Sequence, residues 1–341
     1  GNFMKFIYRL LATLLIASGM HSALADNVLV IRFSHVVAPE SPKGQAAEKF
    51  AQLVAQRSAG KVRVDLFPNS RLYGDQEEIA ALQMGNVEML APSLTKLKVL
   101  HVPDFEVFDL PYLFADTAAV HRVTQGPIGT SLLAKLDRQG VVGLTFWDNG
   151  FKQMSANRPL HKPGDVTGLS LRIQPSQILE AQMKALGARP RALQFSEVYS
   201  ALKSGAVDGT EGPASNFYTQ NLQLAQKYLT LSNHGYLGYA VVANKKFWDG
   251  LTPEIRSTLE GALRDATAFA NESAEQNNAA ALESIRKTGR TQIIELTADE
   301  KSAWHAALAK VHHQAQGKIP AELMANIYRE TSGSVTSASL R

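Results

Sequence analysis

Arg172 is the residue whose surroundings in the sequence most clearly indicate a binding role or a buried ion pair. It lies inside the apolar stretch Leu169–Ile173, whose composition predicts a short buried strand. A buried guanidinium needs a partner, because an unpaired charge in the interior is costly. Either a nearby Asp or Glu forms a salt bridge with it, or its planar fork of N–H groups holds the carboxylate of a ligand. The residue alone does not decide between the two.

Two further segments place charge where helices and strands meet. Lys43 falls in the first turn of a helix predicted to begin after Ser41, and helix N-termini attract anions. Taken alone, Lys43 is typical of a surface lysine. The segment WDNGFKQ at 147–153 follows a predicted strand and brings Asn149 and Lys152 to its end. The carboxyl ends of strands are where α/β sheets bind ligands.

Catalytic chemistry finds little support in the sequence. It contains no HExxH zinc motif, no Walker loop and no GxSxG nucleophile elbow. His312 and His313 are adjacent on a predicted helix and point about 100° apart, which favours a solvated face over a metal site. Asp104, Glu106 and Asp109 alternate with apolar residues, which favours packing over acid–base catalysis. We therefore expect no catalytic residue, no metal and no cofactor.

Composition narrows the class of protein further. The chain has 341 residues, no cysteine and 19% charged residues, which predicts a folded protein of two domains or one large one. The absence of cysteine excludes disulfides, thiol nucleophiles and thiolate metal sites. A formal net charge of +4 is too small to indicate a nucleic-acid partner.

The N-terminus has the three parts of an export signal. Lys5 and Arg9 precede an apolar run at 10–20, which is too short to span a bilayer, and Ala23-Leu24-Ala25 has small residues at the cleavage positions. We expect cleavage after Ala25 and a periplasmic protein. An uncleaved anchor is the alternative. Without residues 1–25 the chain carries a formal charge of +2, since Lys5 and Arg9 are lost and no acidic residue is.

Strand and helix patterns alternate along the rest of the chain, which predicts an α/β fold with a mostly parallel sheet. Ser196 is expected to cap one helix, and Thr297 with Glu300 forms a capping box for the last one. A long helix is expected from about 252 to 288. Strands are expected at 28–33, 61–67, 87–91, 141–147, 169–173, 207–210 and 239–244, and the other helices at 41–59, 76–84, 178–186 and 196–202.

Several stretches, in this order and spacing over about 300 residues, resemble the C4-dicarboxylate-binding (DctP-like) solute-binding proteins of TRAP transporters, the tripartite ATP-independent periplasmic transporters. They include FSHVVAPESPKGQAAEKF at 33–50, GKVRVDLFPNSRLYGD at 60–75, DLPYLF at 109–114 and WDNGFKQMSANRPL at 147–160. GLSLRIQPS at 168–176, LGARPRALQFSEVYSALKSGAVDGTEGP at 186–213, LSNHGYLGY at 231–239 and FWDGL at 247–251 complete the match.

The resemblance implies two α/β lobes around a cleft, joined by hinge strands and a long lobe-spanning helix. It implies a monomer that closes over an organic acid anion and delivers it to the membrane subunits of the transporter. Lobe I is expected at 26–149 plus 238–277, lobe II at 150–237 plus 278–331, and a frayed tail at 332–341.

The resemblance also implies which residues meet the solute. In the family, the arginine of the GLxLR motif grips the ligand carboxylate, and here that is Arg172. The sequence departs from the family at Lys152, where arginine is common, and at Gly212, where asparagine is common. The expected ligand-binding residues are Arg172, Lys152, Lys43, Asn149, Ser93, Phe195, Asn216, His35, Trp147 and Tyr239, with His234 and Glu211 behind them.

Some alternatives stay open at this point. Succinate, malate and fumarate are the expected solutes, but a keto acid, a lactam acid or a sugar acid would also need Arg172. The same cleft would serve a sensor that presents its ligand to a membrane signalling protein. A periplasmic enzyme acting on carboxylic acids would need an acid–base pair near Arg172, which no motif supplies.

Overall fold

The computed structural model describes residues 27–331 and contains a single mixed sheet of nine strands. The strands follow one another in the order β2-β1-β3-β8-β4-β7-β5-β6, with β9 pairing on β8. Pairs are parallel at both ends of the sheet and antiparallel at its centre. The strands are β1 (Leu29–Ser34), β2 (Val62–Phe67), β3 (Met89–Leu90), β4 (Val141–Ala156), β5 (Ser170–Ile173), β6 (Arg189–Ala192), β7 (Gly209–Gly212), β8 (Tyr228–Asn244) and β9 (Gln292–Glu295).

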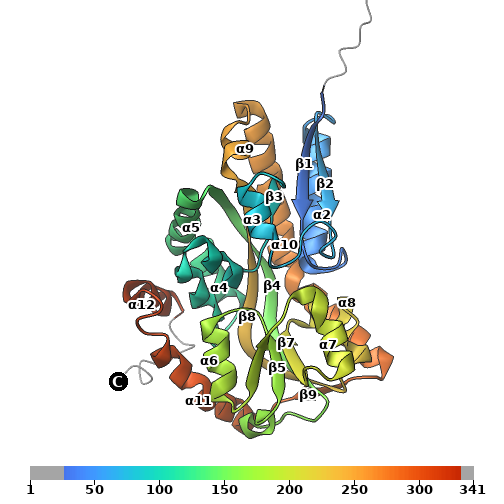
Figure 1. Cartoon of the computed structure of the whole chain (residues 1–341), viewed down its shortest axis with the longest axis vertical. Coiled ribbons are helices and arrows are strands. Elements are labelled where there is room, and N and C mark those ends of the chain that lie inside the picture. Colours follow the sequence, from blue (N-terminus) through green and yellow to red (C-terminus); the bar gives the residue numbers. More distant parts are fainter. Residues whose placement is uncertain (1–26, 332–341) are drawn as a thin grey trace, which may run out of the picture.

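Helices cover the sheet and join its strands (Figure 1). Short 3-10 turns at Leu94–Leu100, Pro103–Asp109 and Phe195–Glu197 also contribute to the connections. The helices are α2 (Pro42–Arg57), α3 (Glu78–Gln83), α4 (Thr117–Thr124), α5 (Pro127–Ala134), α6 (Gln177–Ala185), α7 (Val198–Ser204), α8 (Ala214–Thr219), α9 (Lys245–Asp249), α10 (Pro253–Thr288), α11 (Ala298–Gln314) and α12 (Ala321–Glu330).

Strands β4 and β8 connect the two ends of the molecule. They have 16 and 17 residues and pair antiparallel along almost their whole length, from Val141↔Asn244 to Ala156↔Tyr228. In Figure 1 they run from the part that holds β1, β2 and β3 to the part that holds β5, β7 and β9. The register shifts at three places, between Gly143 and Thr145, Asp148 and Gly150, and Lys152 and Met154. Such bulges bend and twist a strand locally.

Helix α10 makes a second connection between the two ends. It has 36 residues and begins with Thr252 as N-cap, whose side chain accepts a hydrogen bond from the backbone N–H of Ile255. The helix contacts α2 at one end of the molecule, and β4 and α8 further along. The sequence prediction of a helix from about 252 to 288 is confirmed.

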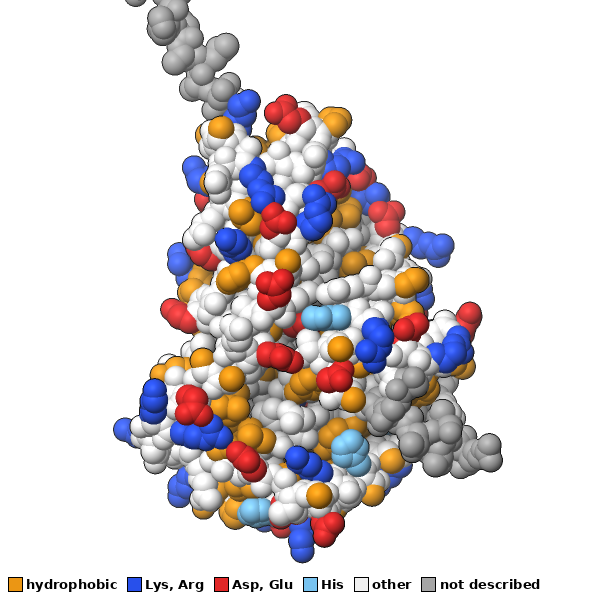
Figure 2. All heavy atoms as spheres, turned by 180° about the vertical axis from the view of Figure 1, so that it is seen from behind, with side chains coloured by type: hydrophobic (Ala, Val, Ile, Leu, Met, Phe, Trp, Pro, Cys, Tyr) orange, Lys and Arg blue, Asp and Glu red, His pale blue; other side chains and the backbone are white. Residues whose placement is uncertain are grey.

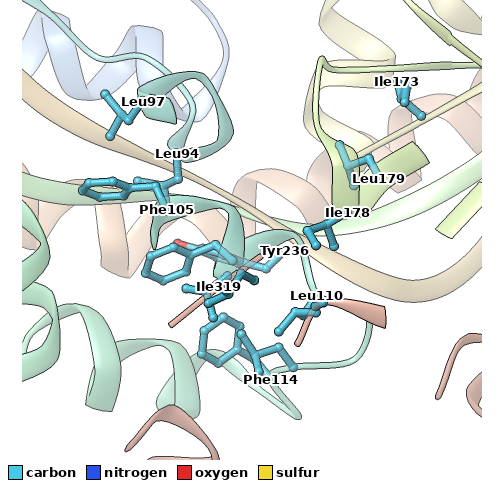
Figure 3. Packing of buried hydrophobic residues seen from close by; sticks show 14 of the residues in the cluster. Leu94, Leu97, Phe105, Leu110, Phe114, Ile173, Ile178, Leu179, Tyr236 and Ile319 are labelled. Carbon is cyan, nitrogen blue, oxygen red and sulfur yellow. The ribbon is translucent and has the colours of Figure 1, made fainter. Parts of the chain in front are cut away.

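The interior consists of three hydrophobic clusters rather than one. One cluster lies between β1, α2, the first half of β4, the second half of β8 and the start of α10. A smaller one surrounds Val198, Phe217 and Ile285. The largest gathers residues from both ends of the sheet, including Leu97, Phe105, Phe114 and Tyr236 near the centre and Ile173, Ile178 and Leu179 further along (Figure 3). The largest cluster therefore connects the two ends of the molecule, and each end also has a smaller cluster of its own.

The surface of the described residues does not indicate a nucleic-acid, membrane or metal partner. Basic and acidic side chains are intermixed on the face seen in Figure 2. None of the helices within 27–331 is both long and apolar enough to traverse a bilayer. Nor do these residues bring together three His, Cys, Asp or Glu side chains that could hold a metal ion.

Several expectations about the elements need correction. The strand expected to end at Trp147 continues to Ala156, because β8 pairs with it throughout. Ser196 does not cap α7, since a 3-10 turn at Phe195–Glu197 precedes that helix. Helix α11 has the expected capping box at Thr297 but is followed by α12. The expected signal peptide and the tail at 332–341 lie outside the described residues.

Candidate functional site

A cavity of about 50 Å³ lies where the two ends of the molecule meet. By the rule that roughly 10–15 Å³ holds one water, it accommodates a small solute and not an oligomer. Its charged lining comprises four basic side chains, Lys43, Lys96, Lys152 and Arg172, and two acidic ones. The other lining residues named below are Asp75, Ser93, Gln174, Phe195, Glu211, Gly212, Asn216 and Tyr239.

Arg172 reaches the cavity from β5 and is only 5% exposed. Its Nε and Nη2 atoms donate to the carbonyl of Leu193 at 3.0 and 2.9 Å. No Asp or Glu among residues 27–331 forms an ion pair with it, and Nη1 has no acceptor there. Burial lowers the pKa of Arg172, against the opposing field of Asp75, Glu211 and Glu197. The alternative of an internal salt bridge for this arginine is therefore wrong.

Lys43 is a second buried cation that lines this cavity. It lies in the first turn of α2, as predicted, but it is 2% exposed and so is not a surface lysine. Its Nζ donates to the carbonyl of Ala91 at 2.9 Å and lies 4.0 Å from the ring centroid of Tyr239. No described carboxylate pairs with it. Burial, and then the charge of Lys96, lower the pKa of Lys43 to about 7.

Lys152, by contrast, has its charge compensated inside the protein. Its Nζ lies 2.8 Å from a carboxylate oxygen of Glu211, whose other oxygen lies 2.6 Å from Nε2 of His234. His234 in turn bonds Ser232 through Nδ1 at 2.7 Å. Burial alone would raise the pKa of Glu211, but Lys152 and His234 lower it to about 2. Glu211, expected behind the binding residues, lines the cavity itself, whereas His234 does not.

Lys96, which the sequence analysis did not single out, is a second cation whose charge is paired with carboxylates inside the protein. Lys96, from the 3-10 turn after β3, forms ion pairs with Asp75 and, at 2.7 Å, with Glu78. Burial would lower the pKa of Lys96, but the two carboxylates raise it. Asp75 ends the quoted stretch GKVRVDLFPNSRLYGD, so the resemblance already covered it. Lys96 lies in SLTKLKVL, where only the mixture of lysine with leucine indicated burial.

Asn149 supports the wall of the cavity from behind. Its Nδ2 donates to Oδ1 of Asn216 at 2.9 Å and to the hydroxyl of Tyr239 at 2.7 Å. Its Oδ1 accepts the hydroxyl of Ser215 at 2.9 Å. Asn216 and Tyr239 line the cavity, and Asn149 does not. Ser93 lines it and accepts a hydrogen bond from Nε2 of Gln174 at 2.7 Å.

Two of the expected ligand-binding residues lie elsewhere. Trp147 is fully buried in the core next to β1, stacked on Phe33 at 6.1 Å, with its indole N–H donating to Thr267. His35 is also buried and borders a different, outer groove with Arg71. Side chains alternate along a strand, and this alternation directs Trp147 into the core.

Phe195 and Gly212 lie where the resemblance implied. The ring of Phe195 is 5.9 Å from the guanidinium carbon of Arg172. At Gly212 an added Cβ would meet no atom within 4 Å, so the absence of the usual asparagine leaves open space in the cavity.

The acidic and histidine clusters do not belong to this cavity. Asp104 pairs with Lys135, and Glu106 with Lys98 at 3.3 Å. His312 is buried between the hydroxyl of Tyr328 and the carbonyl of Pro111, which corrects the expectation of a solvated helix face.

Comparison with known proteins agrees with this architecture. The family model described as bacterial extracellular solute-binding protein, family 7, matches residues 33–318. The chain belongs to this family. Proteins of family 7 are solute-binding components of transport, and the relatives named below are themselves described as periplasmic.

Individual family 7 relatives are similar over most of their length. The C4-dicarboxylate-binding periplasmic protein DctP of Rhodobacter capsulatus is 52% identical over 328 residues, 95% of this chain and 98% of that one. A TRAP periplasmic solute-binding protein from Shewanella oneidensis, with bound succinate, has a TM-score of 0.87 and 38% identity, covering 89% of this chain and 100% of that one. One from Pseudomonas aeruginosa, with bound L-malate, has a TM-score of 0.82 and 40% identity, covering 84% and 99%.

Proposed function

We propose that this protein is the solute receptor of a TRAP transporter and that it captures a C4-dicarboxylate such as succinate, malate or fumarate. One observation carries the proposal: Arg172 and Lys43 are buried in the same cavity, and neither has a described carboxylate partner. Neither cation forms an ion pair within residues 27–331, so each can bind one carboxylate of a ligand with two negative charges. The succinate and L-malate in the two similar structures support the same class of solute.

The four cations of the cavity have different roles in this proposal. Arg172 presents unused N–H groups for one carboxylate, and Lys43 presents its ammonium for the other. Lys152 and Lys96, already paired with Glu211 and Asp75, hold the walls in place. The proposed ligand contacts are thus Arg172, Lys43, Ser93, Phe195, Asn216 and Tyr239, with Asn149 and His234 supporting them from behind. His35 and Trp147 are not proposed as ligand contacts, because neither side chain lines the cavity.

Capture is expected to proceed by closure around the solute. A ligand that binds both walls favours the closed form, bending β4 and β8 at their register shifts. The loaded monomer then delivers the solute to the membrane subunits, after export directed by a signal peptide cleaved behind Ala25. We propose no turnover of the solute, because the cavity's two acidic side chains, Asp75 and Glu211, are both held in ion pairs.

A ligand panel with matched charges tests the function. Succinate, malate and fumarate should raise the melting temperature, whereas succinamate, which has the shape of succinate but one carboxylate, should bind at least tenfold more weakly. One lost charge-assisted hydrogen bond is worth roughly 1.5–3 kcal/mol, which is the origin of this factor. Thermal shift and calorimetry measure both quantities, since binding stabilises the folded state. Equal affinity for succinate and succinamate would contradict the assignment of a dianion.

Ligand binding should also take up a proton. With a pKa of about 7, Lys43 loses its proton in the empty protein as the pH rises above neutrality. A bound dianion favours the charged form and restores it, so affinity is full below about pH 7 and falls by up to about tenfold per pH unit above it. The groups facing Lys43 are Lys96, Asp75, Glu78 and His35. Calorimetry at pH 8 in buffers of different ionisation enthalpy should give different apparent enthalpies, and identical values would refute proton uptake.

A further inference from the structure

One short segment determines where the guanidinium of Arg172 points. The carbonyl of Leu193 accepts both Nε and Nη2, and the ring of Phe195 lies 5.9 Å from the guanidinium carbon. This segment, 193–195, follows the edge strand β6 and precedes α7. A shift of the segment would therefore move the arginine or leave two of its donors unpaired.

The same segment is attached to the opposite wall by Asp75. The backbone N–H of Phe195 donates to Oδ2 of Asp75 at 2.6 Å. Asp75 belongs to the loop between β2 and α3, at the other end of the sheet from β6. The two loops approach closely at Gly74, where an added Cβ would lie 2.9 Å from Oε1 of Gln194. The hydrogen bond therefore crosses the cleft.

Asp75 is itself held rigidly on its own side. Its carboxylate pairs with Lys96, which also pairs with Glu78 at 2.7 Å. Burial would raise the pKa of Asp75, but Lys96, the N–H of Phe195 and Arg172 lower it, so the side chain is ionised at neutral pH. An ionised, anchored acceptor gives a stronger hydrogen bond than a neutral or mobile one.

We propose that Asp75 is a positioning residue for the solute: by accepting the N–H of Phe195 across the cleft, it fixes segment 193–195 in the closed form and thereby aims Arg172 at the ligand carboxylate. This inference rests on the proposed function, because it gives Arg172 the task of holding that carboxylate. Since Asp75 acts through the segment, its loss affects every solute that Arg172 holds by the same factor.

Three substitutions separate the position of the acceptor from its charge. Asp75→Ala removes both and should weaken succinate and malate equally, by about tenfold or more, mainly through faster dissociation. Asp75→Glu keeps the charge but moves the oxygen by one methylene group, and should weaken both to a similar extent. Asp75→Asn keeps an oxygen acceptor in place without the charge, so it should lose less affinity than Asp75→Ala and Asp75→Glu. Asp65→Ala, on neighbouring β2, is the control for loss of a carboxylate away from the cavity.

Closure is measured independently of affinity. The sequence has no cysteine, so spin labels attach only to cysteines that are introduced. Met84→Cys and Leu224→Cys place labels at two exposed positions on opposite sides of the cleft, and the distance between the labels reports closure. At saturating succinate, Asp75→Ala and Asp75→Glu should leave a larger open population than the unaltered protein or Asp75→Asn.

Each contrary result has a distinct meaning. Unchanged affinity and closure in Asp75→Ala would overturn the positioning role alone. Unequal losses for succinate and malate would overturn it in favour of direct contact with the solute. An affinity of Asp75→Asn as low as that of Asp75→Ala would overturn the claim that the position of the acceptor aims Arg172. If the unaltered protein bound no dicarboxylate, the proposed function would fall and this inference with it.

Discussion

Replacing Arg172 with alanine is expected to abolish dicarboxylate binding, with a loss of at least a hundredfold in affinity. The guanidinium is buried, keeps two donors on Leu193 and has no carboxylate partner among the described residues. Two charge-assisted hydrogen bonds to a ligand carboxylate, at roughly 1.5–3 kcal/mol each, correspond to a factor of a hundred or more. Arg172→Lys should recover little, because an ammonium cannot form the bidentate contact.

The neighbouring strand provides a matched control. Arg191 on β6 is directly opposite Arg172 in the register of the sheet, but its side chain is exposed. Arg191→Ala removes the same charge at nearly the same place and should leave affinity within about twofold, as exposed charges contribute little. Isothermal titration calorimetry with succinate compares the variants. Near-normal binding by Arg172→Ala would show that the solute is held by other groups.

Replacing Lys43 with methionine should have two opposite effects. Burial without a counterion costs the empty protein stability, which is why the pKa of Lys43 falls from 10.5 to about 7. The unfolded chain binds more protons between those two values, so this penalty is largest at and below about pH 7 and is relieved as the pH rises towards 10.5. Methionine fills similar space without charge, so the empty variant should be more stable at pH 7 by on the order of a few kcal/mol.

The same variant should bind succinate at least about tenfold more weakly and lose the proton uptake described above. Chemical denaturation at pH 7 and at pH 9.5 measures the stability difference, which should shrink at the higher pH. Lys61→Met, at an exposed position just after α2, is the control and should change neither stability nor affinity appreciably. A variant at Lys43 that lost stability would show that the lysine is a structural support rather than an unpaired charge.

Local sequence signals predicted the elements well where capping residues and glycines mark the ends. Ser41, Thr252 and Thr297 each cap the helix that follows them, as their side-chain hydrogen bonds show. The extent of β4 and β8 was not predicted, because a strand's length depends on its partner, and these partners lie far apart in the sequence. Segment 147–153 therefore appeared to end a strand that in fact continues past it.

The residues of the site were likewise predictable from the sequence only in part. Arg172 was predictable because a charge inside a short apolar stretch has few explanations. Lys96 and Asp75 were not singled out, since their chemistry arises only when two loops meet in the folded chain. Trp147 illustrates the converse error: it belongs to the segment WDNGFKQ that also holds Lys152, yet the alternation along β4 turns its ring into the core.

The central position of β8 has a consequence for how the chain acquires its structure. Met89 in β3 must pair with Ala243, and Val141 with Asn244, before the N-terminal strands have a complete sheet. Contacts between such distant residues form slowly, because a long stretch of chain must first be brought together. Neither half of the molecule should fold on its own from a truncated gene. A newly made chain should thus stay unfolded until nearly all of it has been synthesised.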